Sequence, residues 1–427
     1  MIKFPYGNSD FYSLRTEGYL YLDRTPYIPL LEDAGKQLIF LRPRRFGKSL
    51  LLSTLANYYD IKRADVFETL FGDLAIGQNP TVEHNQYLIL RWDFSKVSVQ
   101  GNTKVITRNL FDHINQAIKG FREQYRDYLT IEFDIIPNNA IGSFESLANA
   151  VYNSGQQLYL LIDEYDNFAN EVLMQVNATQ QRYEDLVQSE GILKTLFKAI
   201  KGNASEGKVG RVFITGVSPV VMSDMSSGYN VATNIYLDDD FNGLCGISNN
   251  ELMTLVTNLT IECHQSDNDK LIILETMRQF YNGYRFCTSE KQLRIYNPTL
   301  CFYFLRHFQK ACEAPTKILD GNLAMDANKI RYIANLPNGE NIIHQLLDEQ
   351  SPMLLDELED RFGVEALREL QSGEKFMISL LYYFGVLTIV GRGELGELVF
   401  GIPNLVIRAL YVEELRKRKP LKQHFGI

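Results

Sequence analysis

The stretch QLIFLRPRRFGKSLLLSTLANYY, residues 37–59, is the part of the sequence on which the fold depends. It opens with a short apolar run, passes through an arginine-rich turn, and continues after Gly47 with residues that favour a helix. A short apolar run of this length is typical of a buried β-strand, and the second half has helical character. The stretch therefore predicts a strand, a tight loop and a helix in direct succession.

The loop ends in Gly47, Lys48 and Ser49, at the point where the helix would begin. A glycine lets the backbone come close to a phosphate, and the amides of residues 46–50 would point from the positive end of a helix. The lysine would bring charge to the terminal phosphates, and the serine hydroxyl would suit Mg²⁺. The usual phosphate-binding loop reads GxxxxGK followed by Ser or Thr, and here Arg42 stands in place of its first glycine.

The cations of this loop have a second interpretation, as solvated surface charges at a helix start. Cations there oppose the helix dipole and are unfavourable unless an anion sits among them. The charges in question are Arg42, Arg44, Arg45 and Lys48. The residues we expect to hold a nucleotide phosphate are Arg44, Arg45, Phe46, Gly47, Lys48, Ser49 and Leu50.

A second segment, QLYLLIDEYD (157–166), is an apolar run that ends in two acids. At the carboxyl end of a parallel strand, Asp163 would lie near the phosphate loop and hold Mg²⁺ through water. Glu164 would point elsewhere and polarise an attacking water as the catalytic base. Alone, the pattern is equally typical of an ordinary strand end. Together with the loop about 115 residues earlier, it indicates a Mg-nucleotide site with Lys48 and Glu164 as the catalytic groups.

A third polar strand end, RVFITGVSP (211–219), contributes Thr215 and Ser218. Such side chains contact the γ-phosphate or its water in ring-type ATPases, and they are equally typical of small residues in a turn before proline. Both are therefore candidates for nucleotide binding.

The order of elements predicts an α/β chain. Apolar runs at 37–43, 87–95, 157–166 and 211–218 alternate with helical patterns, which indicates a parallel sheet with helices on both faces. We expect residues 1–245 to form this P-loop ATPase domain. Helical periodicity dominates afterwards, as in 297–311 and 354–370, so residues 246–427 should form a mainly helical lid.

The end of the chain predicts a helix, a hairpin and a last helix. These are FMISLLYYFG (376–385), VLTIVGRGELGELVFGI (386–402) and PNLVIRALYVEELRKR (403–418). This order is similar to that of a winged-helix domain.

Composition narrows the class of protein. The 427 residues carry 43 basic and 52 acidic side chains, a net charge of −9, which argues against a surface coated for nucleic acid but leaves a local basic groove open. The five cysteines are odd in number and form no CxxC pair, which argues against a disulfide framework or zinc site and for a reducing, cytoplasmic compartment. No stretch reaches the roughly 18 apolar residues of a membrane span.

Several of these motifs together resemble the bacterial AAA-ATPase-like family that often carries a PD-(D/E)XK-type nuclease domain at its C-terminus. The matching pieces are YLDRTPYIPLLE (21–32), LRPRRFGKSLLLSTL (41–55), LLIDEYD (160–166), FITGVSPV (213–220), YNGYRF (281–286), RIYNP (294–298) and IPNLVIRALY (402–411). In that family an arginine-rich loop replaces the first glycine as a rule. The resemblance implies P-loop roles for Lys48 and Ser49, the Mg²⁺ role for Asp163 and the base role for Glu164.

The resemblance also raises questions about other segments. It places Asp23 and Arg24 in a family element that we expect to pack beside the nucleotide base. Tyr281–Tyr284 belong to another signature, either a turn with aromatic packing or a direct site. The sequence ends at Ile427, and residues after 411 hold no D…ExK arrangement, so we expect no nuclease activity from this chain.

These observations predict an ATPase that uses ATP and Mg²⁺ to drive a motion between its two domains. The resemblance implies a DNA-linked or defence-like role. One alternative is a nucleotide-gated module that binds a protein or DNA partner with little turnover, and another is a small-molecule kinase. An arginine finger would come from Arg44 or Arg45 in cis, or from Arg285, Arg294 or Arg331 of a neighbouring subunit in a homo-oligomer.

Overall fold

A five-stranded sheet forms the centre of the computed structural model, which describes residues 1–167, 191–219, 231–318, 330, 334, 339–348, 353–360 and 373–418. Its strands are β1 (Gln37–Leu41), β2 (Tyr87–Asp93), β3 (Gln157–Asp163), β4 (Arg211–Gly216) and β5 (Thr233–Asn234). Every pairing is parallel, and the order is β2-β3-β4-β1-β5. The α/β prediction is confirmed, and the four longer strands fall on the four apolar runs. No sequence pattern marked β5.

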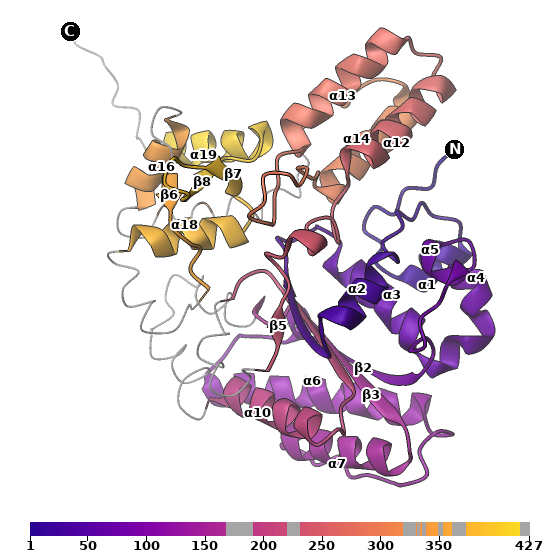
Figure 1. Cartoon of the computed structure of the whole chain (residues 1–427). Coiled ribbons are helices and arrows are strands. Elements are labelled where there is room, and N and C mark those ends of the chain that lie inside the picture. Colours follow the sequence, from indigo (N-terminus) through magenta and orange to yellow (C-terminus); the bar gives the residue numbers. More distant parts are fainter. Residues whose placement is uncertain are drawn as a thin grey trace.

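Helices cover both faces of the sheet (Figure 1). One face carries α1 (Phe11–Thr16), α2 (Tyr27–Ala34) and α3 (Lys48–Tyr59), and the other carries α6 (Thr103–Gln124), α7 (Ala140–Asn153) and α10 (Ile192–Ser205). Because both faces are covered, β4 is buried along its whole length and β3 along all but its first residue. Short elements follow α3 and β2 or precede α12: η1 (Ile61–Val66), α4 (Phe67–Phe71), α5 (Ala75–Gln78), η2 (Phe94–Lys96) and η3 (Asp239–Phe241).

Three helices after the sheet pack around a core of their own, and Figure 1 shows them projecting together. They are α12 (Asn249–Glu262), α13 (Asp267–Tyr281) and α14 (Pro298–Ala311). Serine capping boxes start α12 and α13, and Asn297 with Pro298 starts α14. The predicted helix at 297–311 is confirmed.

In its described residues, the C-terminal part combines a small sheet with three helices. Its elements are α16 (Gly339–Leu347), β6 (Met353–Leu355), α18 (Glu374–Tyr383), β7 (Thr388–Arg392), β8 (Leu398–Gly401) and α19 (Leu405–Arg418), and the strand order is β6-β8-β7. The helix, hairpin and last helix expected for 376–418 are all present. The helix predicted for 354–370 is wrong at its start, because β6 pairs antiparallel with β8 there. Residues 361–370 lie outside the described part of the chain.

A disulfide joins Cys263 to Cys312, with Cα atoms 5.5 Å apart, which shows that the prediction of no disulfide was wrong. The two residues are the C-caps of α12 and α14. Helix packing brings these two helix ends together although 49 positions separate the cysteines in the sequence, and no spacing rule reveals such a pair. The inference of a reducing compartment depended on this point.

Candidate functional site

The loop between β1 and α3 has the backbone that its sequence requires. Gly47 caps α3 with a φ of 103°, a left-handed conformation that other residues rarely adopt. A Cβ at this position would meet nothing within 4 Å, so the backbone angle, and not crowding, calls for glycine. Lys48 and Ser49 open the helix, as predicted, with the first amides of α3 at the loop.

Arg42 has a structural role. Only 1% of it is exposed, and its guanidinium donates to the carbonyls of Leu41, Tyr236 and Phe241 at 2.7–2.8 Å. It also lies 4.4 Å from the ring centroids of Phe40 and Phe286, and burial lowers its pKa to about 10. The interpretation as a solvated surface charge is therefore wrong for this residue. In place of the usual glycine, the arginine ties the start of the loop to residues 236–241.

The two segments that the sequence predicted to converge do meet. Lys48 Nζ lies 3.5 Å from Glu164 Oε1, and Arg44 Nε lies 3.8 Å from Glu164 Oε2. Lys48 is buried and also donates to the carbonyls of Arg42 and Pro43 at 3.0 and 3.3 Å. Glu164 has a φ of 54°, an uncommon angle outside glycine that aims its side chain back at the loop.

The strand between them, β4, contributes Thr215 to this junction. β4 separates β1 from β3, and the Thr215 hydroxyl donates to Asp163 Oδ1 at 2.6 Å. Ser218 donates its hydroxyl to Asp166 Oδ2 at 3.0 Å. Both hydroxyl side chains are fully buried, and neither lines the pocket described below. Their contact with a nucleotide phosphate stays a prediction.

Asp166 fastens the end of β3 to the end of β4. It accepts the Val217 amide at 3.0 Å and the Ser218 amide at 2.7 Å. Burial and then the nearby charge of Glu164 raise its pKa, against the effect of these amide donors. This buried carboxylate keeps the acidic strand tip in place.

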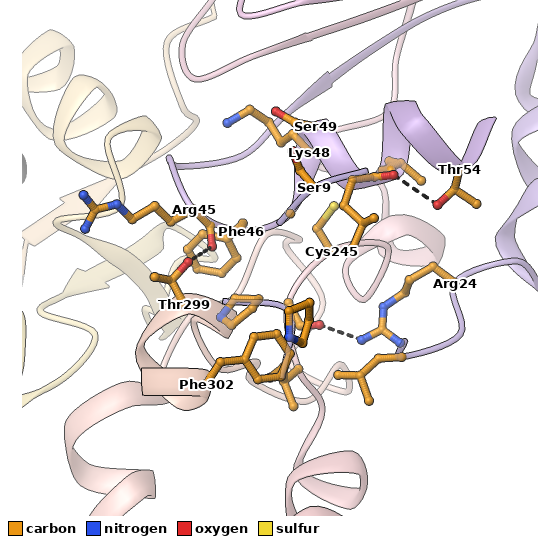
Figure 2. A pocket seen from close by; sticks show the side chains of 18 of the residues that line it. Ser9, Arg24, Arg45, Phe46, Lys48, Ser49, Thr54, Cys245, Thr299 and Phe302 are labelled. Atoms are coloured by element: carbon orange, nitrogen blue, oxygen red, sulfur yellow. Dashed lines mark hydrogen bonds between the residues drawn. The ribbon is translucent and has the colours of Figure 1, made fainter. Parts of the chain in front are cut away.

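A pocket of about 280 Å³ lies against the loop (Figure 2). At one end it is lined by Arg45, Phe46, Gly47, Lys48, Ser49, Leu50 and Glu164. Arg44 and Asp163 do not line it. In Figure 2, Lys48 and Ser49 lie toward one end, and Phe302 lies at the other.

The rest of the lining, which reaches the opposite end at Phe302, is largely apolar and comes from four other segments. They are residues 5–9, 20–24, 244–247 and 298–302, and the lining includes Pro5, Leu20, Tyr21, Leu22, Cys245, Ile247 and Phe302. Tyr21 shares a hydrogen bond of 3.3 Å with Thr54, and burial raises its pKa to about 12. A flat apolar ring fits such surroundings. The signal for this end was the pair of family motifs at 21–32 and 294–298.

Arg24 lines the pocket and holds its wall together. Its guanidinium donates to the carbonyl of Gly246 at 2.6 Å and to both carboxylate oxygens of Glu251. Asp23 instead accepts the amides of Thr25 and Ala75 at 2.8 and 2.9 Å and does not line the pocket. The structure therefore separates the two neighbours that the sequence analysis had grouped.

The YNGYRF motif packs under the loop. The buried ring of Phe46 meets Tyr284 and Phe286 edge-on at centroid distances of 4.9 and 5.1 Å. Gly283 has a φ of 106°, and a Cβ there would lie 1.9 Å from the carbonyl oxygen of Pro403. The motif thus forms a turn with aromatic packing, one of the two interpretations above. Arg331 lies outside the described residues.

The site offers oxygen donors that suit Mg²⁺. Ser49 lines the pocket, and within the described residues Asp163 accepts a side-chain hydrogen bond only at Oδ1, from Thr215, which leaves its other oxygen for a metal. Hydroxyl and carboxylate oxygens are ligands that Mg²⁺ prefers. Within the described residues, no three His, Cys, Asp or Glu side chains gather into a metal-binding group.

Among the helices of the described residues, none combines the length and apolar character needed to cross a membrane.

Comparison with known proteins identifies the family. The model of a family described as predicted AAA-ATPase matches residues 5–226, slightly more than half of the chain. An uncharacterised protein in the vnfD 5′ region of Azotobacter chroococcum mcd 1 is 26% identical over 315 residues, 72% of this chain, and the chain spans about half (52%) of that relative's length.

A solved structure agrees on the fold. The Walker-type ATPase of Pyrococcus abyssi superimposes with a TM-score of 0.52 at 11% identity, covering 92% of this chain and 96% of the other. At this identity the likeness shows the fold alone. The family match, the parallel sheet and the loop at its centre lead to one conclusion: the chain belongs to the predicted AAA-ATPase family.

Proposed function

We propose that this chain binds ATP with Mg²⁺ in the pocket beside α3 and hydrolyses it. The observation that carries the proposal is the approach of Lys48 Nζ to Glu164 Oε1, 3.5 Å apart at one end of the pocket. A cation for the terminal phosphates and a carboxylate for an attacking water stand side by side there. The apolar end of the pocket would take the adenine ring.

The residues divide the chemistry between them. The amides of residues 46–50 and the Lys48 ammonium would hold the phosphates and balance the charge that develops during phosphoryl transfer. Glu164 would accept a proton from a water molecule. At the same time the water oxygen would bond to the γ-phosphorus, and the bond from that phosphorus to the bridging β,γ-oxygen would break. Ser49 and Asp163 would hold Mg²⁺, which withdraws charge from the phosphate oxygens when bound.

A second function is favoured by the ion pairs of Glu164. Its carboxylate faces both Lys48 and Arg44, at 3.5 and 3.8 Å. A carboxylate held by two cations is poorly placed to take a proton from water. The alternative is therefore a nucleotide-gated binding module, in which ATP displaces Glu164 from Lys48 and changes the surface offered to a partner, with little turnover.

Two substitutions test the proposal. We expect Glu164→Gln to lower the rate of phosphate release by about 10²- to 10⁴-fold, the usual worth of a general base, while ATP still binds. Lys48→Ala should weaken ATP binding itself. Phosphate release and the Kd of a fluorescent ATP analogue measure the two effects.

Glu123→Gln, an exposed carboxylate on α6, is the matched control and should leave both quantities unchanged. Equal turnover in wild type and Glu164→Gln would refute the catalytic role. Tight binding without turnover in the wild type would favour the gated module.

The wider role is also a proposal. Hydrolysis would move residues 246–427 against residues 1–245, in a cytoplasmic, DNA-linked or defence-like setting, with DNA or a protein as partner and a homo-oligomer as the working form. The pocket wall at 298–302, which lies beside the loop, supports the proposed motion, and the DNA-linked or defence-like role rests on the resemblance of the sequence motifs alone. ATP turnover with and without DNA, together with the mass of the nucleotide-bound protein, separates the two kinds of partner.

A further inference from the structure

Two arginines face each other across the hairpin that follows α13. Tyr284 and Ile295 form an antiparallel bridge, with reciprocal backbone hydrogen bonds of 3.2 and 2.8 Å. One step along the two arms, Arg285 and Arg294 are therefore directly opposite each other. Asn242 closes the hairpin beyond them, because its side chain accepts the Phe286 amide at 2.9 Å and donates to the carbonyl of Leu293 at 3.0 Å.

Both guanidinium groups belong to the same face of the hairpin. Side chains alternate along extended arms, and Tyr284, Phe286 and Ile295 all belong to the main hydrophobic core. Arg285 and Arg294 thus share the opposite face. Like charges in directly opposed positions destabilise such a pair, unless an anion lies between them.

Arg285 is held in place, and within the described residues its charge has no partner. Only 8% of it is exposed, its amide donates to Thr388 Oγ1 at 2.9 Å, and its carbonyl accepts from the Tyr382 hydroxyl at 3.3 Å. Its Nε is fully covered without a hydrogen bond. In the described part of the chain, neither its guanidinium nor that of Arg294 forms a hydrogen bond or ion pair. The two terminal nitrogens of Arg285 escape complete burial, so they reach the surface unpaired.

Carboxylates on the segments around the hairpin have partners of their own. Glu275 binds Arg278 through both oxygens at 2.7 and 2.8 Å, and Glu290 accepts the Arg392 amide at 2.8 Å. Asp239 accepts the Ser289 amide at 3.3 Å. Burial and then the positive charges of Arg285 and Arg278 lower the pKa of Arg294.

We infer that Arg285 and Arg294 bind a phosphate group, at a site separate from the nucleotide pocket. A planar guanidinium with unpaired nitrogens matches the oxygens of a phosphate, and a second guanidinium opposite it completes a two-sided clamp. Neither residue lines the pocket beside α3. The phosphate comes either from a nucleic-acid backbone or from a free phosphate, since both present the same oxygens.

The experiment uses the full chain in a Lys48→Ala background, so that the P-loop takes up no phosphate. Fluorescence anisotropy with a labelled DNA duplex and calorimetric titration with inorganic phosphate form the two arms. We expect Arg294→Gln and Arg285→Leu each to weaken the affinity about tenfold in at least one of the two arms. A tenfold loss is the typical contribution of a charge-assisted hydrogen bond. In the duplex arm, the slope of log affinity against log salt should also become shallower by about 1 per arginine removed.

Arg126→Gln removes an exposed arginine that follows α6, and it is the matched control expected to bind like the parent. Loss in the duplex arm assigns the site to a phosphodiester, and loss in the inorganic phosphate arm assigns it to a free anion. Binding in neither arm, or equal binding by all variants, overturns the inference.

Thermal unfolding gives a second readout that a structural role would not produce. Without an anion, Arg285→Leu should unfold at the same temperature as the parent or higher, because it removes an unpaired buried charge. Added phosphate should raise the unfolding temperature of the parent and not that of the variant. A variant strongly destabilised in phosphate-free buffer would show that the arginine serves the fold, which contradicts the inference.

Discussion

Gly283 shows how closely one residue can be constrained in this protein. It combines a φ of 106° with a backbone oxygen, that of Pro403, 1.9 Å from where a Cβ would stand. We expect Gly283→Ala to lower the free energy of unfolding by about 3 kcal/mol or more, since left-handed strain of about 1–2 kcal/mol adds to a backbone collision. Urea unfolding followed by circular dichroism measures the change.

The control for Gly283 is Gly155→Ala, in the turn before β3. Gly155 has a φ of 70° but no atom within 4 Å of a built Cβ, so it reports the strain without the collision. Its loss should be about 1 kcal/mol. Equal losses in the two variants would mean that the Pro403 contact relaxes easily.

At the same scale, the sequence predicted some site residues and not others. Gly47, Lys48 and Glu164 could be predicted because their chemistry depends on local backbone: a left-handed cap, a helix start and a strand tip. The role of Arg42 could not, since its carbonyl partners at Tyr236 and Phe241 lie almost 200 positions away. Its residue type suggested a solvated charge or a phosphate ligand. In the folded chain it is instead buried and bound to backbone carbonyls.

At the scale of elements, the clamp between Arg24 and the start of α12 is sensitive to pH. Burial alone would raise the pKa of Glu251, but the hydrogen bonds and charge of Arg24 outweigh it, so this pKa lies below its ordinary value of 4.5. The clamp therefore contributes stability that is complete above pH 4.5 and is lost as the pH falls through the lowered pKa. We expect Glu251→Gln to cost about 1–3 kcal/mol at pH 7 and less in acid, as urea unfolding at pH 7 and pH 4 would show.

Glu275→Gln is the matched control for that clamp. Glu275 also binds an arginine, Arg278, but on the exposed surface of α13, where such pairs contribute little. Its substitution should change stability little at either pH. A Glu251 variant that behaves like it would show that the Arg24 contact is no more than a surface pair.

The strands and helices that were predicted correctly are those whose own apolar pattern specifies the secondary structure. β1 to β4 and α3 follow apolar periodicity, and so do α14, α18 and α19. β5 and β6 have two and three residues and exist through pairing with β1 and β8, which no local pattern shows. The disulfide between Cys263 and Cys312 escaped prediction for the same reason.

At the scale of the whole molecule, the pocket joins segments from both halves of the chain. Residues 5–9, 20–24, 244–247 and 298–302 meet around it. We expect a non-hydrolysable ATP analogue to slow amide hydrogen exchange in these four segments as well as in the loop, because a ligand that binds the folded pocket stabilises the segments that line it. Exchange measured by mass spectrometry, with Lys48→Ala as the control, checks this; protection confined to residues 42–50 would mean that the apolar end takes no part in binding.

The phosphate end of this pocket was predictable from the sequence and the apolar end was not. Lys48, Ser49 and Glu164 carry recognisable chemistry at recognisable spacings. Tyr21, Ile247 and Phe302 are ordinary apolar residues whose common purpose appears only when four distant segments are folded together. Family motifs marked two of these segments, and for one of them, at Asp23 and Arg24, we expected packing beside the nucleotide base.

Phe46 and Pro43 connect the phosphate loop to the turn after α13 and to the C-terminal part. The ring of Phe46 is wedged against Tyr284, while Pro43, earlier in the same loop, stands where a Cβ on Gly385 would be only 2.6 Å away. Close-packed protein interiors are hardly compressible, so they transmit a displacement from one group to the next. If the loop changed its path when a terminal phosphate departs, the ring of Phe46 would push on the turn after α13. The start of β7 would then be displaced as well.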